Sequence, residues 1–122
     1  MYGYLVIKTS GYVGVVESED YHFTLQELYN AVGCNSIELV RIPYTFYMCV
    51  DDNGKMLGKT VNPLATWLYG VENQFVVGDV VFAMDEYLYE GAEPDIYKMP
   101  LENCYEWKEL LESKLVELGF RQ

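Results

Sequence analysis

The sequence predicts an α+β domain with a mostly antiparallel sheet, in the order β-β-α-β-β-α-β followed by a C-terminal amphipathic helix. Two observations support this fold class. Short runs of β-branched and aromatic residues alternate with segments of helical periodicity, and turn sequences separate neighbouring strand candidates. The last of the helical segments, Leu101–Leu118, is the longest.

The composition is that of one folded domain spanning residues 1–122. With 51% hydrophobic and 22% charged residues, the chain lies outside the range of disordered sequences. Its apolar runs are far shorter than the roughly 18 residues of a membrane span, and no signal peptide is evident, so we expect a cytoplasmic protein in a bacterial host. Three cysteines without a Cys-x-x-Cys pair favour reduced, buried thiols over a disulfide framework or a zinc site.

The first part of the chain predicts a hairpin and a capped helix. Tyr4–Ile7 and Tyr12–Val16 are strand candidates separated by a Thr-Ser-Gly turn. Thr24 and Glu27 form a Ser/Thr-x-x-Glu capping box, and Gly33 supplies a C-cap. The helix between them should bury one apolar face, made of Leu25, Leu28, Tyr29 and Val32.

The middle of the chain predicts two more strands, Ile37–Ile42 and Phe46–Val50. Pro43 interrupts them, because proline cannot donate to a strand ladder. Asp52–Lys55 follows and contains an Asn-Gly pair, which favours a tight hairpin turn because both residues tolerate positive φ.

The remaining elements are a short helix, a strand and the C-terminal helix. Asn62 suits an N-cap, Pro63 suits the first helical position, and Gly70 follows the helix. Phe75–Met84 has strand character. Gly119 closes the C-terminal helix, whose apolar side carries Cys104, Trp107, Leu111, Leu115 and Leu118.

Net charge is the strongest compositional signal. Nineteen acidic against eight basic residues give −11 and a pI of about 4.3. Nucleic acid and anionic membranes are therefore unfavourable partners, because the field of the protein repels phosphate. No basic residue lies between Lys59 and Lys98, an interval with seven carboxylates: Glu72, Asp79, Asp85, Glu86, Glu90, Glu93 and Asp95.

The candidate partner-binding segment runs from Ala83 to Tyr97. Its carboxylates and tyrosines fit two interpretations: a solvated connection pinned by its tyrosines, or a contact surface in which carboxylates meet Lys and Arg while tyrosines supply apolar area. The candidate site residues are Asp85, Glu86, Tyr87, Tyr89, Glu90, Glu93, Asp95 and Tyr97.

No catalytic, metal or cofactor site is predicted. His22 is the only histidine, and we interpret it as a polar residue ahead of a helix cap. A calcium loop starting at Asp51 would need Gly at its sixth position and Glu at its twelfth, where the chain has Met56 and Asn62. An enzyme is thus the least supported class of function.

Several short motifs in the middle of the chain resemble a known family. They are Thr24-Leu25-Gln26-Glu27-Leu28 with Val32-Gly33, Ile37-Glu38-Leu39-Val40, Asp51-Asp52-Asn53-Gly54-Lys55 with Gly58, Asn62 with Ala65-Thr66 and Leu68, and Val77-Gly78-Asp79-Val80-Val81-Phe82. In their order and spacing, over residues 24–84, they resemble a small domain family of unknown function that is common in phages, plasmids and other mobile elements. The resemblance implies no catalytic residues, and it leaves residues 85–122 as the part particular to this protein.

Three functional hypotheses follow. The leading one is an inhibitor of a host defence system, such as a CRISPR nuclease, that imitates nucleic acid and occupies a basic surface. The second is an oligomeric sponge for a nucleotide signal, which would depend on Lys8, Arg41, Lys55 and Lys59 for phosphate. The third is a structural or regulatory partner of another mobile-element protein.

Overall fold

The computed structural model describes residues 1–42, 46–70, 74–85 and 96–119. Their elements are β1 (Tyr2–Ile7), β2 (Val13–Ser18), α1 (Leu25–Val32), β3 (Ile37–Ile42), β4 (Phe46–Asp51), α2 (Pro63–Tyr69), β5 (Val80–Asp85), β6 (Ile96–Tyr97), β7 (Met99–Pro100) and α3 (Leu101–Glu117). The predicted fold class and element order are confirmed, with two short strands, β6 and β7, added before α3.

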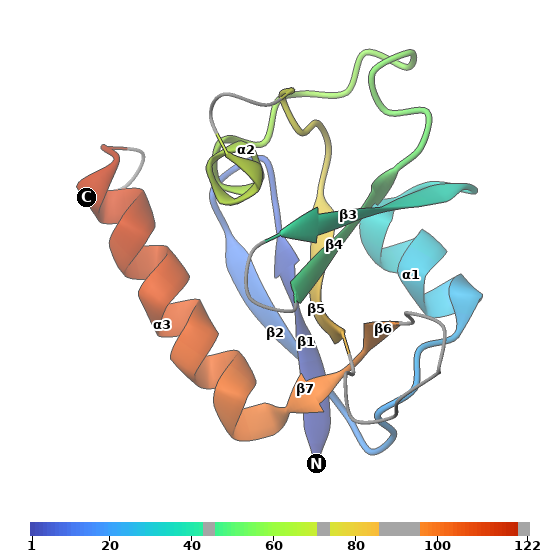
Figure 1. Cartoon of the computed structure of the whole chain (residues 1–122), viewed down its shortest axis with the longest axis vertical. Coiled ribbons are helices and arrows are strands. Elements are labelled where there is room, and N and C mark those ends of the chain that lie inside the picture. The colour runs from blue at the N-terminus through green and yellow to red at the C-terminus, as the bar shows by residue number, and fades with distance from the viewer. Residues whose placement is uncertain (43–45, 71–73, 86–95, 120–122) are drawn as a thin grey trace.

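One antiparallel sheet joins all of these strands in the order β2-β1-β5-β4-β3. The last long strand, β5, lies in the middle of the sheet between β1 and β4 (Figure 1). The two short strands continue existing ones, since β6 pairs with β5 and β7 pairs with β1. β7 leads directly into α3 and so fixes where that helix starts.

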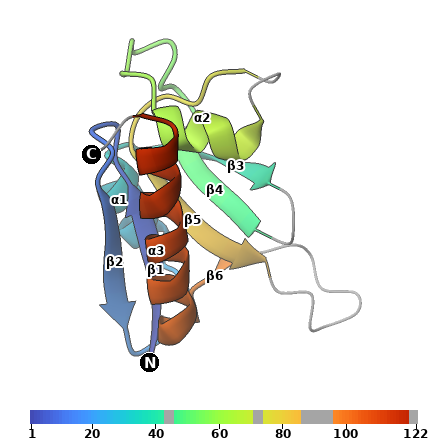
Figure 2. The ribbon, with the colours of Figure 1, turned by 90° about the vertical axis from the view of Figure 1, so that its left-hand side faces the viewer.

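The helices cover opposite faces of the sheet. Figure 1 shows α1 on one side and α3 on the other, and Figure 2 shows α3 in front of the sheet with α2 above it. Because side chains alternate along a strand, β5 points Val80 and Phe82 toward α2 and α3, and Val81 and Ala83 toward α1.

The predicted helix caps are present. Thr24 and Glu27 form the reciprocal capping box of α1, and Gly33 ends that helix at φ 75°. Asn62 caps α2 by accepting from the backbone N–H of Ala65 at 3.1 Å. The predicted apolar face of α1 is only partly correct, because Leu28 and Val32 are buried whereas Leu25 is 60% exposed.

The predicted hairpin turn at Asp52–Lys55 is wrong. After β4 the chain passes through irregular turns and α2 before it returns as β5. Gly54 does not adopt positive φ; its N–H donates to the carbonyl of Asp51 at 3.1 Å, and the left-handed position is Gly58 at φ 69°. The turn therefore directs the chain away from the sheet instead of back along it.

The predicted strand at Phe75–Met84 is too long at its start. Only Val80–Asp85 forms β5. Gly78 lies at φ 78°, which turns the chain, and Val77 makes only an isolated bridge with Val61. Within residues 75–77, Val76 is buried beside α2, where its N–H donates to Thr66 Oγ1 at 3.0 Å, whereas Phe75 is 66% exposed.

Candidate binding surfaces

The two ends of the predicted partner-binding segment lie side by side. In the β5–β6 pair, Met84 is opposite Tyr97 and Asp85 is opposite Ile96. The segment thus runs from the end of β5 to β6, two strands that pair with each other, and β7 separates it from α3. The other predicted residues, Glu86, Tyr87, Tyr89, Glu90, Glu93 and Asp95, lie outside the described residues.

Tyr97 belongs to a cluster of aromatic rings. Its ring centroid is 5.8 Å from that of Tyr21 and 5.5 Å from that of His22, and the Tyr21 and His22 rings are 4.0 Å apart. Tyr2 joins through Tyr21 at 5.7 Å. Sequence reasoning did not find this cluster, because β6 and the residues after β2 meet only in the folded sheet. It packs the base of the candidate segment against the domain.

Lys98, the residue after Tyr97, turns inward. Its Nζ lies 2.9 Å from Glu27 Oε2 and donates to Ser18 Oγ at 2.8 Å. The same nitrogen lies 5.3 Å from the centroid of the Phe23 ring. Partial burial raises the pKa of Glu27, but hydrogen bonds from Lys98 and Thr24 outweigh that effect and hold it below its usual range. This lysine is therefore part of the interior, and its charge is balanced there.

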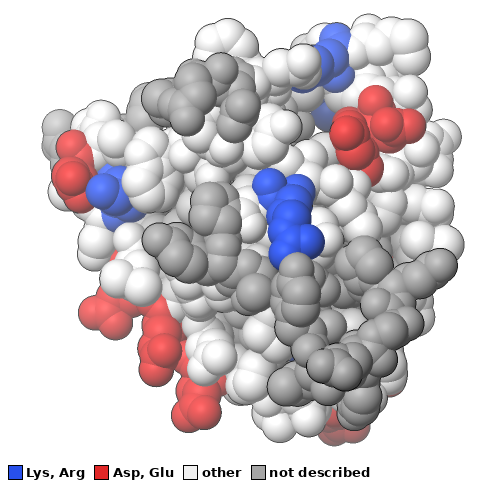
Figure 3. Space-filling view, in the orientation of Figure 1, with Lys and Arg blue, Asp and Glu red and all other residues white. Residues whose placement is uncertain are grey.

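The outer side of α3 carries an acidic row. Glu102, Glu106 and Glu109 are exposed, and their spacing of four and three residues places them on one face of the helix. Figure 3 shows acidic side chains along the side of the molecule where α3 lies. No ion pair among the described residues involves these three carboxylates. The row faces solvent directly opposite the buried residues Cys104, Leu111 and Leu115.

Ion pairs engage several of the described basic side chains. Lys108 pairs with Glu112 and Lys114 with Glu117, both within α3. Lys59 lies 2.7 Å from Asp51 Oδ2. Burial by itself would raise the pKa of Asp51. Hydrogen bonds from Lys59 and from the Asn53 N–H have the larger effect and hold this pKa below its usual range. These pairs compensate charges locally and leave the α3 row as an uncompensated surface.

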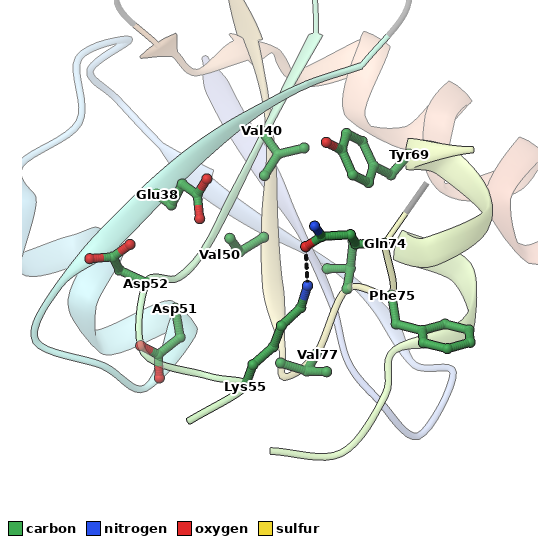
Figure 4. Close-up of a pocket in the computed structure, with 11 residues that line it drawn as sticks. Glu38, Val40, Val50, Asp51, Asp52, Lys55, Tyr69, Gln74, Phe75 and Val77 are labelled. Carbon is green, nitrogen blue, oxygen red and sulfur yellow. Dashed lines mark hydrogen bonds between the residues drawn. The ribbon is translucent and has the colours of Figure 1, made fainter. Parts of the chain in front are cut away.

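A pocket of about 200 Å³ lies beside the loop after β4 (Figure 4). Val40, Val50 and Val77 form its apolar walls, and Lys55 extends across it to donate from Nζ to Gln74 Oε1. The protein's own lysine thus occupies the polar part of this pocket. Among the described residues, no group of three or more His, Cys, Asp or Glu side chains is arranged to hold a metal ion.

An apolar groove of about 550 Å³ lies between α2 and α3. Its floor is an aromatic cluster in which Phe46 and Phe82 stack with ring centroids 4.9 Å apart, and Phe46 and Trp107 make a T-shaped contact with centroids 4.9 Å apart. Trp67 of α2 forms one wall, and Lys114 Nζ lies 4.8 Å above the Trp67 ring. Helical periodicity placed Trp107 on the apolar side of α3, but no pattern in the sequence links it to Trp67.

The comparisons with known proteins identify a family and no activity. The model of DUF3846, described as a domain of unknown function, matches residues 1–94. The match is wider than the resemblance over residues 24–84 and includes the first hairpin and most of the acidic segment. No curated protein and no solved structure matches the chain. Separately, no helix among the described residues is long and apolar enough to cross a membrane.

Proposed function

Because the chain belongs to the DUF3846 family, whose domain has no assigned function, we propose its role from its surface: a non-enzymatic binding protein that occupies a basic nucleic-acid-binding surface on another protein. The partner in this proposal is a host defence protein. The setting in this proposal is a phage or other mobile element, as the resemblance implies, and the place of action is the cytoplasm of its bacterial host.

The observation that carries this proposal is the acidic row on α3. Glu102, Glu106 and Glu109 are exposed, lie on one face and have no ion-pair partner among the described residues. On a chain with a net charge of −11, such a face attracts a basic protein over a distance of about one Debye length and repels nucleic acid. The partner is therefore a protein that normally binds phosphate.

The number of carboxylates per length of α3 can be compared with the number of phosphates per length of a DNA strand, which gives the share of the proposed mimicry that α3 could supply. Glu102 and Glu117 lie about 22 Å apart along the helix axis at 1.5 Å per residue. Because Glu117 pairs with Lys114, the acidic row places in that length three carboxylates without an ion pair among the described residues, Glu102, Glu106 and Glu109. One DNA strand carries a phosphate every 3.4 Å or so, which is about six or seven over the same length. The α3 row thus has half of that density or slightly less, and we assign the remainder to the carboxylates of residues 85–95.

We favour this role over the nucleotide sponge because of where the basic side chains are used. Lys59 pairs with Asp51 and donates to the Gly33 carbonyl at 2.9 Å. Lys55 donates to Gln74. Arg41 donates from Nη1 to Tyr47 Oη at 3.4 Å. Three of the four cations on which phosphate binding would depend therefore already have partners within the protein.

The test is charge reversal with a matched control. One variant changes Glu102, Glu106 and Glu109 to Lys, and the control changes three exposed carboxylates on other elements, Glu19, Glu38 and Asp52, to Lys. Both variants alter the net charge equally, and circular dichroism checks their folds. A third variant reverses Asp85, Glu86, Glu90, Glu93 and Asp95.

We expect affinity capture from bacterial lysate to recover a basic nucleic-acid-binding protein at low salt. The α3 variant should lose it, the 85–95 variant should retain less of it, and the control should keep it. High salt should release it, because exposed charges are screened. Equal capture by the α3 variant and the control, or a neutral partner that resists salt, would contradict the proposal.

A further inference from the structure

The groove between α2 and α3 has the shape of a helix-binding site. From α3 it is lined by Trp107, Leu110, Leu111 and Lys114, which follow the spacing i, i+3, i+4 and i+7. That spacing is the stripe one helix presents to another when they pack side by side. Trp67 and Leu68 of α2 form the facing wall. An occupant with the same periodicity would fit between the two helices.

Much of the apolar surface in this groove is left uncovered in the single chain. Leu110 is 61% exposed and Trp67 is 36% exposed, whereas Phe82 and Leu111 on the floor are fully buried. Apolar side chains that are exposed beside a buried aromatic floor are typical of a site that receives a partner's apolar anchors.

The rim of the groove is acidic. Glu106 precedes Leu110 by four residues and therefore lies beside it on the surface of α3. Among the lining residues that the structure describes, the one cation is Lys114, and it pairs with Glu117 at 2.9 Å, so this part of the rim carries a net negative charge. An occupant with an apolar stripe between basic side chains matches both the floor and the rim.

We propose that this groove binds a basic amphipathic helix, with its apolar residues inserted between Trp67 and Trp107 and a Lys or Arg residue facing Glu106. The inference rests on the proposed function, since it specifies the structural element through which the basic partner is held. The acidic row supplies attraction, and the groove supplies the contact that fixes position and orientation.

The probe is a synthetic helix-forming peptide of about 18 residues, with Leu at i, i+3, i+4 and i+7, Lys elsewhere and no tryptophan. A second peptide has Glu in place of Lys, and a third keeps the composition of the first but disrupts the leucine stripe. The chain has two tryptophans and both line the groove, so tryptophan fluorescence reports occupancy directly. We expect the Lys peptide to bind, the scrambled peptide to bind at least tenfold more weakly, and the Glu peptide not to bind.

Two substitutions on α3 distinguish binding in the groove from attraction by the surface charge alone. Leu110→Asp alters the groove wall, and Val116→Asp makes the same change at a residue that is 51% exposed and lies on another side of the helix. Both sites are exposed, so both variants should fold. Leu110→Asp should weaken peptide binding roughly tenfold or more, and Val116→Asp by about twofold or less.

Lys114→Ala tests the charge of the occupant. Removing this cation should strengthen binding of the Lys peptide about two- to threefold, because it repels the peptide and its loss leaves Glu117 unpaired. If the groove bound an apolar anion instead, Lys114→Ala would weaken that binding. Weaker peptide binding by this variant, or preference for the Glu peptide, would overturn the inference.

The inference and the proposed function fail in different ways. If Leu110→Asp and Val116→Asp have the same effect while Glu106→Lys weakens binding, the acidic row binds basic proteins and the groove has no part in it. If the Lys peptide does not bind, the groove inference is wrong, and lysate capture by the α3 variant still decides the proposed function.

Discussion

The two faces of the sheet are built differently although they share the same strands. On the α1 side, the strands present Tyr4, Tyr47 and Cys49, and a helix of eight residues covers them. On the opposite side, they present Leu5, Met48 and Phe82 to α2 and to the 17 residues of α3. The first face is small and partly polar, whereas the second is large and apolar.

This difference explains where binding surfaces arise. The α1 face is completed by the ion pair of Lys98 with Glu27, whose polar groups satisfy one another. The apolar face has more surface than α2 and α3 cover together, so a groove remains between them. The exposed charged row lies on α3, and α3 also forms one wall of the groove. This helix begins beyond the family match over residues 1–94.

The largest expected effect compares one leucine on each side. Leu115→Ala in α3 should lower the free energy of unfolding by about 3–5 kcal/mol, and Leu28→Ala in α1 by about 2–3 kcal/mol. Leu115 is 1% exposed and Leu28 is 4% exposed, so the hydrophobic free energy lost when either side chain is truncated is similar. Leu115→Ala leaves a cavity in a close-packed apolar layer. Leu28→Ala leaves one beneath the short helix α1, which can move to close it. Urea denaturation monitored by circular dichroism measures both.

If Leu28→Ala and Leu115→Ala lower the free energy of unfolding equally, the two faces of the sheet are equally rigid. A larger loss at Leu28 would reverse the comparison. The slope of the transition should be the same for both variants, because the area exposed on unfolding hardly changes.

A smaller effect is expected from the ion pair that closes the α1 face. Glu27→Gln should cost about 1–2 kcal/mol, because it leaves the Lys98 ammonium, whose side chain is only 2% exposed, without its counter-ion. Lys98→Met should cost less, about 1 kcal/mol or below, since the freed Glu27 side chain is 35% exposed and can be hydrated. Equal costs, or a larger cost for Lys98→Met, would show that the lysine has other compensation.

The same pair predicts a pH dependence. The folded-state pKa of Glu27 is below its usual value, so its contribution is present above the unfolded-state pKa of about 4.3 and is lost as the pH falls through the folded-state pKa. The stability difference between the wild type and Glu27→Gln should therefore be full near neutral pH and shrink below about pH 4. Urea titrations at several pH values measure it, and a difference that persists in acid would contradict this assignment.

Local signals predicted the elements better than they predicted the sites. The capping box at Thr24 and the Asn62-Pro63 start of α2 depend on residues a few positions apart, and both are correct. The Asn-Gly turn at Asn53 failed because the position of β5 between β1 and β4 depends on residues far apart in the chain. The groove escaped prediction for the same reason, since Phe46, Trp67 and Trp107 come from three elements. Of the predicted site, only Tyr97 is placed with its side chain, and there it packs with Tyr21 and His22.

The last comparison of the two faces uses cysteines and changes no residue. Cys49 of β4 is buried on the α1 face, and Cys104 is buried on the sheet-facing side of α3. Burial raises their pKa values to about 12 and about 11, so neither thiol ionises near pH 8 in the folded protein. Labelling then requires local opening, and the eight-residue α1 should open more often than the 17-residue α3. We expect iodoacetamide to modify the half-buried Cys34 first, then Cys49, and Cys104 last, as followed by peptide mass spectrometry. Labelling of Cys104 before Cys49 would contradict this expectation. It would mean that α3 opens away from the sheet more often than α1, and that the groove is lost whenever α3 opens.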